Sequence, residues 1–199
     1  MDLKTIEQIA YDSMAERKEH KSREPGWLFF HGARTARIAS WLCARLEYED
    51  QCDVIYVAAL FHDIGKGNKP HNEIGAAMTW QLLEPYCSTE ELEAVCEIIK
   101  RHNMRNHASD SQPVKIVQDA DILDHVGAIG VWTSFYWSGV HNETVEDHVR
   151  FVCGEENDRY RKNMRASLNF DVSKQIFDER IAFEKDFFGR FHKVYKEGY

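Results

Sequence analysis

The sequence contains no run of about 18 apolar residues, the length that a membrane-spanning helix needs. It also lacks an excess of positive charge, because 25 Lys and Arg residues stand against 33 Asp and Glu residues, and the formal net charge is −8. We therefore do not expect nucleic acid or an anionic membrane surface as a partner. The N-terminal segment has mixed charge and no apolar stretch, so we expect a cytoplasmic protein without an export signal.

Paired cysteines are absent as well. The five cysteines show no CxxC spacing, and most of them lie among apolar residues in helical patterns. This usage is typical of reduced core cysteines in a cytoplasmic protein.

The alternation of apolar and polar residues that predicts β-strands is not found over any useful length. Helical periodicity dominates, and it predicts a single all-α domain over 1–199, a helical bundle of about seven to nine helices. A polar, irregular loop is expected at 103–113. The expected helices lie at about 3–14, 31–46, 51–63, 71–84, 89–101, 114–137, 144–153 and 171–196.

The central helix at 51–63 is nearly all apolar, yet it ends in His62 and Asp63. Burying these groups without a partner would cost free energy, so they require a metal ion or a salt bridge. Imidazole and carboxylate together suit Mn, Fe, Zn, Ni or Co better than Ca or Mg.

Other polar residues stand at comparable places. His31 follows an apolar stretch at the start of a helix, and Asp121 is flanked by apolar residues. His71 begins a helix and His102 ends one. Because several helix ends can point at one place, these side chains are candidates for a common metal site.

Taken in order, His31, His62-Asp63 and Asp121 resemble the H…HD…D pattern of the HD-domain superfamily of metal-dependent phosphohydrolases. The stretch HDIGK at 62–66 is similar to a form common in that family. HNEIGA at 71–76 looks like a stretch of its cyclic-dinucleotide phosphodiesterase branch, whereas 115–130 and 177–191 resemble small bacterial HD hydrolases. The resemblance extends over roughly 27–190, and we expect a metal-binding core at about 27–140 with C-terminal helices at 144–197 packed on it.

The resemblance implies that His31, His62, Asp63 and Asp121 hold one divalent transition metal, with positions left open for water and a phosphate oxygen. A bound ion lowers the pKa of its water toward neutrality, and Asp63 could orient that water. The expected activity is hydrolysis of a nucleotide or another small phosphate ester.

Two neighbouring aspartates compete with or support Asp121. Asp119 and Asp121 lie about 200° apart around a helix, so both cannot face one point. The family motif selects Asp121, which leaves Asp119 as a cap or ion-pair partner, although the sequence alone does not decide between them. Asp124 shares the face of Asp121 and could form hydrogen bonds to the metal ligands.

Two cations could neutralise a phosphate. Lys66 follows Asp63 by three residues and could act in catalysis as a point charge, or it could be an ordinary solvated lysine. Arg34 lies one turn after His31 and could bind a phosphate or pair with a carboxylate.

His71 and His102 decide whether the site holds one ion or two, because in two-metal relatives additional histidines at these places bind a second ion. Their alternative role is contact with the substrate. Asn103 stands where some phosphodiesterases carry another histidine, and their GYP-type signature is missing. Six ligands would also match the mixed-valent di-iron oxygenases of the superfamily, and a non-enzymatic sensor is a third alternative.

The remaining polar features are expected to be peripheral. The loop at 103–113 lies between two helices of the site and could close over a substrate. Several histidines lie in polar surroundings and are expected to be exposed, namely His20, His107, His141, His148 and His192.

Overall fold

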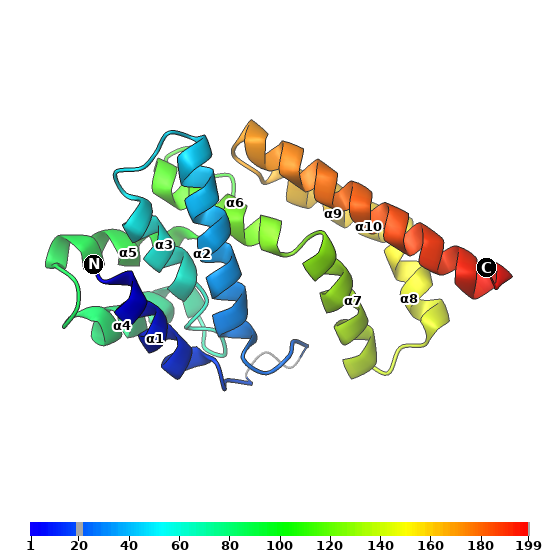
Figure 1. Ribbon diagram of the computed structural model, residues 1–199, viewed down its shortest axis with the longest axis horizontal. Helices are drawn as coiled ribbons and strands as arrows, with labels where there is room; N and C mark the ends of the chain where they lie inside the picture. Colours follow the sequence, from blue (N-terminus) through cyan, green and yellow to red (C-terminus); the bar gives the residue numbers. More distant parts are fainter. Residues whose placement is uncertain (19–21, 199) are drawn as a thin grey trace. The chain divides into compact units, whose positions relative to one another are not determined.

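The computed structural model describes residues 1–18 and 22–198, and in these ranges the chain forms ten helices and no strand (Figure 1). The all-α prediction is confirmed, although the helices slightly outnumber the seven to nine expected. They are α1 (Leu3–Met14), α2 (Trp27–Arg45), α3 (Cys52–Phe61), α4 (His71–Leu83), α5 (Thr89–Arg101), α6 (Gln112–Asp124), α7 (Ala128–Val140), α8 (Val145–Val152), α9 (Glu155–Ala166) and α10 (Asp171–Glu197).

Two differences account for the additional helices. The helix expected at 114–137 is broken between α6 and α7 at Gly127, whose φ of 82° and ψ of −142° suit only glycine. The N–H of Gly127 donates to Glu184 Oε1 at 2.7 Å, so a residue distant in sequence fixes the break. In addition, α9 forms in a polar segment where no helix was expected.

The chain divides into two compact units, Met1–Asp121 and Ile122–Tyr199. The expectation of a single domain, with a metal-binding core and C-terminal helices, stays a prediction. Among the described residues, none of the helices has the length and apolar character required to cross a membrane. His20 lies outside the described residues.

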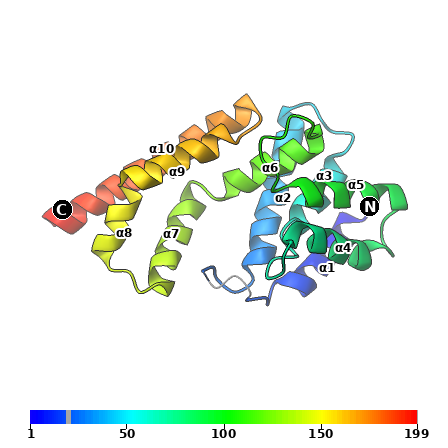
Figure 2. The same cartoon turned by 180° about the vertical axis from the view of Figure 1, so that it is seen from behind.

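In the first unit, α3 is the central helix, as predicted, and its residues from Val57 to Phe61 are buried. It packs along α2, and both views show these two helices side by side (Figures 1 and 2). Gly32 makes this close packing possible, because a Cβ there would lie 2.2 Å from the carbonyl oxygen of Leu60. Glycine at this position therefore brings the start of α2 against the end of α3.

The turn that follows α3 lies directly on the start of α4. A Cβ on Gly65 would stand 2.0 Å from the carbonyl oxygen of His71 and 2.6 Å from the amide nitrogen of Gly75. Only glycine allows this approach, so the HDIGK turn and the first residue of α4 are held against each other. The expected start of α5 is also confirmed, since Ser88 and Glu91 form a capping box.

In the second unit, a buried ion pair joins α9 to α10. Arg161 Nη2 donates to Glu184 Oε2 at 2.8 Å, and both side chains are less than one-tenth exposed. Burial raises the pKa of Glu184, while Arg161 and the N–H of Gly127 act in the opposite direction. One carboxylate thus ties together α9, α10 and the break before α7.

His148 of α8 contradicts its sequence interpretation, because it is buried rather than exposed. Its Nδ1 lies 2.8 Å from Ser138 Oγ, and its ring stacks on Phe135 at 4.5 Å. Its neighbours in sequence are polar, but the aromatic residues that cover it come from α7 and α10. Of the other histidines, His107 and His141 are exposed as expected, whereas His192 is partly buried.

Candidate metal centre

Three elements of the first unit bring the four predicted ligands together. His31 lies in the second turn of α2, because this helix begins four residues earlier than expected, at Trp27. His62 and Asp63 directly follow α3, and Asp121 lies near the end of α6. All four are less than one-tenth exposed, although each carries a polar or ionisable group.

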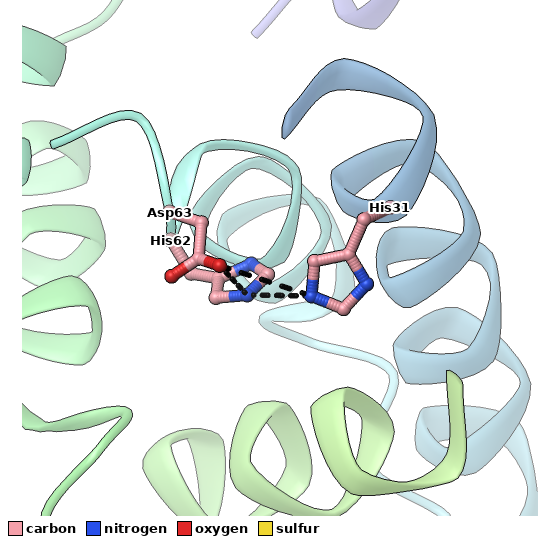
Figure 3. Close-up of side chains that lie close together, drawn as sticks. All are labelled: His31, His62 and Asp63. Atoms are coloured by element: carbon pink, nitrogen blue, oxygen red, sulfur yellow. Dashed lines mark hydrogen bonds and ion pairs between the residues drawn. The ribbon is translucent and has the colours of Figure 1, made fainter. Parts of the chain in front are cut away.

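The ligand atoms face one another across a short distance. His31 Nε2 lies 3.1 Å from His62 Nε2 and 3.2 Å from Asp121 Oδ1. Asp63 Oδ2 lies 3.6 Å from His62 Nε2 and 4.0 Å from His31 Nε2, and Figure 3 shows these three side chains converging. His62 Nε2 and Asp121 Oδ1 are 3.7 Å apart. Two imidazoles and two carboxylates thus offer one atom each to a common place.

The hydrogen bond of His62 shows which of its nitrogens can bind a metal. Its Nδ1 lies 2.7 Å from the carbonyl oxygen of Ala59, so Nδ1 carries the hydrogen that is donated to this acceptor. In the neutral ring, Nε2 then has a free lone pair, and Nε2 is the atom that faces His31. A ring nitrogen fixed in this way is the usual arrangement of metal-bound histidine. The donor set therefore fits a divalent transition metal.

A second group of ligand atoms adjoins the first. His71 Nε2 lies 3.4 Å from His102 Nε2, and Asp63 Oδ1 lies 3.7 Å and 3.6 Å from these two atoms. His102 Nδ1 lies 2.6 Å from the carbonyl oxygen of Ile99, so its Nε2 also has a free lone pair. Asp63 stands between the two groups, with Oδ2 toward one and Oδ1 toward the other.

Electrostatics keep Asp63 ionised. Burial alone would raise the pKa of its carboxyl group, but electrostatic interactions with His62, His102 and Lys66 hold this pKa well below its usual range. Burial, together with the charge of Lys66, lowers the pKa of His71 to about 4. A charged carboxylate beside a neutral imidazole is the state in which both groups bind a metal ion.

The two predicted phosphate-binding cations lie in different surroundings. Lys66 Nζ is 3.5 Å from Asp63 Oδ1, and its side chain is 35% exposed, so it stands at the edge of the site. The guanidinium carbon of Arg34 lies 5.1 Å from the ring centre of Trp27, which itself stacks on His31 at 5.2 Å. Trp27 is therefore a contact shared by Arg34 and His31.

The neighbouring aspartates also have distinct places. Asp119 is fully buried, but among the described residues it is in none of the groups of ligand atoms that could surround an ion. Asp124 is buried in the second unit. Burial lowers the pKa of Arg180 there, and the charge of Asp124 opposes this shift without reversing it. Asp121 is the aspartate whose carboxylate reaches His31.

Sequence reasoning missed Arg105, which lies in the loop between α5 and α6. Its guanidinium group donates to Asp121 Oδ2 and to the carbonyl oxygen of Gln118. Nothing in the local pattern around Arg105 distinguishes it from a solvated loop residue. Only the folding of the loop back onto α6 brings it to Asp121.

Known proteins show the same fold and part of the same sequence. A family model described as the HD domain matches residues 28–125, a range that includes all six histidine and aspartate ligands proposed above. The uncharacterized protein YpgQ of Bacillus subtilis is 25% identical in an alignment 178 positions long, which covers 82% of this chain and 82% of YpgQ.

Solved structures resemble nearly the whole chain. The crystal structure of Bacillus subtilis YpgQ in complex with ADP has a TM-score of 0.68 at 21% identity and covers 96% of this chain and 98% of its own. An HD-superfamily hydrolase from Bacillus thuringiensis has a TM-score of 0.70 at 24% identity, and the match covers 99% of this chain and 100% of that protein. A predicted HD-superfamily hydrolase from an uncultured Thermotogales bacterium has a TM-score of 0.67 at 21% identity, and the match covers 97% of this chain and 92% of that protein. These likenesses establish the fold.

Proposed function

Since this chain carries an HD domain and belongs to that family, we propose that it is a metal-dependent phosphohydrolase acting on a nucleotide or another small phosphate ester. One observation carries the proposal. His31, His62, Asp63 and Asp121 are buried, and their ligand atoms face one another within 3.1 to 4.0 Å along the measured pairs. So many buried ionisable groups without an ion would be costly, whereas a divalent cation offsets the charge of both carboxylates.

In this proposal His31, His62, Asp63 and Asp121 hold one Mn, Fe, Ni, Co or Zn ion. When bound, such an ion supplies a water of lowered pKa and polarises a phosphate oxygen. Asp63 has a second oxygen, Oδ1, turned away from His31 and His62, and it can accept a hydrogen bond from an attacking water. Lys66 lies beside this oxygen and supplies positive charge for a phosphate.

Arg34 is the second proposed phosphate-binding residue. It is partly exposed, and its guanidinium group lies over Trp27, the ring that stacks on His31, so it stands close to a predicted ligand. We propose a nucleotide as the substrate class because the related YpgQ structure is a complex with ADP. We also propose that Asp124, the last residue of α6 and one turn after Asp121, helps to hold Asp121 in place as a metal ligand.

A second candidate function follows from the position of Asp63 between two groups of ligand atoms. His71 and His102, together with Asp63 Oδ1, would hold a second ion. A two-metal cyclic-nucleotide phosphodiesterase or a mixed-valent di-iron oxygenase would use such a pair. Two irons per chain together with substrate-dependent oxygen uptake would favour the oxygenase over both hydrolases.

The test is a screen for release of phosphate or pyrophosphate from nucleoside mono-, di- and triphosphates, with Mn, Co, Ni, Fe or Zn added. We expect hydrolysis by the wild-type protein and its loss in His62→Ala and Asp63→Ala. His141→Ala and Asp186→Ala are matched controls, because these residues are exposed and lie in the second unit, far in sequence from the predicted ligands, and they should retain full activity. Undiminished turnover in Asp63→Ala would contradict the proposal.

A further inference from the structure

Arg105 lies in the loop between α5 and α6, and its side chain contacts α6, which the residues around it in the sequence do not predict. Its Nη2 donates to Asp121 Oδ2, and its Nη1 donates to the carbonyl oxygen of Gln118. Both acceptors belong to α6 and lie about one turn apart. The planar guanidinium group therefore spans a backbone carbonyl and a carboxylate of the same helix, which a lysine could not do with one nitrogen.

The loop that carries Arg105 is fastened to α6 by buried polar contacts. The side-chain amide of Gln118 donates to the carbonyl oxygens of Arg101 and Met104 at 3.2 and 3.1 Å. It also lies 2.9 Å from Asp110 Oδ2, and Arg101 Nε donates to Asp110 Oδ1 at 2.6 Å. Gln118 is fully buried and Asp110 is 5% exposed. Both ends of the loop are thus joined to α6, and Arg105 is placed between them.

Asp121 consequently uses its two oxygens differently. Oδ1 lies 3.2 Å from His31 Nε2 and 3.7 Å from His62 Nε2, where the proposed ion would sit. Oδ2 accepts the hydrogen bond from Arg105. A carboxylate with one oxygen occupied in this way is restricted to offering the other.

We propose that Arg105 is a positioning residue that makes Asp121 a ligand through one oxygen only, an inference that rests on the proposed metal site. An ion bound by both oxygens of Asp121 would lose the coordination position that the attacking water needs. Arg105 would therefore keep that position open, and it acts through Asp121 rather than by touching the reacting atoms.

A direct phosphate contact is the rival role for this arginine. The structure favours positioning, because both terminal nitrogens of Arg105 are directed at acceptors on α6. The two roles differ in kinetics. Loss of a phosphate contact raises KM, whereas loss of an open coordination position lowers kcat.

The experiment compares the wild-type full-length chain with Arg105→Ala and Arg105→Lys, and with Arg190→Ala as the control. Arg190 is an exposed arginine that also pairs with one aspartate, at 3.0 Å. Each protein is loaded with Co²⁺ for visible absorption spectra and titrated with Mn²⁺, and kcat and KM are measured on the best substrate. The Co²⁺ spectrum reports the kind and arrangement of the ligands without requiring turnover.

For Arg105→Ala we expect a Co²⁺ absorption spectrum that differs from that of the wild type, because the second oxygen of Asp121 would replace a water ligand, and retained Mn²⁺ binding. We expect kcat to fall about 10- to 100-fold, the usual effect of removing a hydrogen bond to a metal ligand, with KM little changed. Arg105→Lys keeps the charge at Asp121 and should fold and lie between the wild type and Arg105→Ala. Arg190→Ala should match the wild type in every measurement.

Several outcomes would overturn the inference. A wild-type Co²⁺ spectrum in both Arg105 variants contradicts it, as does a raised KM with unchanged kcat, which would assign Arg105 to the substrate phosphate. These results leave the proposed function intact. A wild-type chain that binds neither Co²⁺ nor Mn²⁺ contradicts the proposed function itself, and the inference with it.

Discussion

At the scale of single residues, the same kind of hydrogen bond orients two histidines of the site. His62 and His102 each follow the end of a helix, and each directs Nδ1 at the carbonyl oxygen three residues earlier. This hydrogen bond fixes the ring and leaves Nε2 with a lone pair directed at the ligand cluster. The sequence predicted which histidines to examine, but the orientation of each ring depends on the backbone at the helix end.

The residues that sequence reasoning missed are those whose partners are remote. Arg105 and Asp121 are 16 positions apart, and His148 is covered by aromatic residues of two other helices. Periodicity and motif matching use only residues that are close together in the sequence. They therefore could not predict the contact of Arg105 with Asp121 or the aromatic contacts of His148. Asp121, by contrast, was selected over Asp119 by the motif, and it is the one that reaches His31.

His148 leads to a prediction about pH. Burial lowers its pKa below the ordinary value of 6.5, with Glu143 acting in the opposite direction. The folded protein therefore binds this proton less readily than the unfolded chain. The stabilisation that depends on neutral His148 is fully present above pH 6.5 and is lost as the pH falls below it.

The measurement is the free energy of unfolding in urea from pH 5 to 8 for the wild type and for His148→Phe, which cannot titrate. We expect the wild type to lose stability relative to the variant as the pH falls from 7 to 5. His141→Phe, at an exposed histidine, is the control and should keep the pH dependence of the wild type. A constant difference between the wild type and His148→Phe over this range would contradict the account.

At the scale of helices, close contacts made by glycines position the site. Gly32 lets α2 touch the end of α3 beside His31 and His62, and Gly65 lets the following turn touch α4 beside His71. Most helices, including the capped start of α5, could be predicted from local pattern. The break at Gly127 could not, because a contact with Glu184 fixes it, and an apolar pattern continues on both sides.

Gly32→Ala tests the role of this contact. The added Cβ would meet the backbone oxygen of Leu60 at 2.2 Å, so α2 and α3 must separate. We expect a loss of about 1–3 kcal/mol in unfolding free energy, as in other overpacked cores. Because His31 and His62 lie on the separating helix ends, binding of Mn²⁺ should weaken as well.

Gly189→Ala is the matched control, since Gly189 is also a helical glycine but no atom lies within 4 Å of the added Cβ. It should leave Mn²⁺ binding unchanged and stabilise the protein by up to about 1 kcal/mol through helix propensity. Equal stability and equal Mn²⁺ affinity in Gly32→Ala and Gly189→Ala would show that the close contact does not position the ligands.

At the scale of the whole molecule, the family match and the candidate site coincide. The HD domain match runs over 28–125, and the ligands from His31 to Asp121 fall inside the first compact unit. The H…HD…D pattern predicted the ligand residues in this part of the chain. The C-terminal helices carry no comparable motif, and α9 in particular was missed because its sequence is polar and its one buried charge, Arg161, finds its partner on α10.

The most direct test of the central claim is the metal content of the full-length chain, purified without tag or chelator and measured by elemental analysis. The account predicts at least one transition metal ion per chain in the wild type and in His141→Ala, a variant of an exposed histidine in the second unit, and a loss of that ion in His62→Ala. A second ion that disappears in His102→Ala while the first remains would extend the site to His71 and His102. A wild-type chain without any transition metal, which also fails to take up Mn, Co, Ni, Fe or Zn when these are added, would contradict the account.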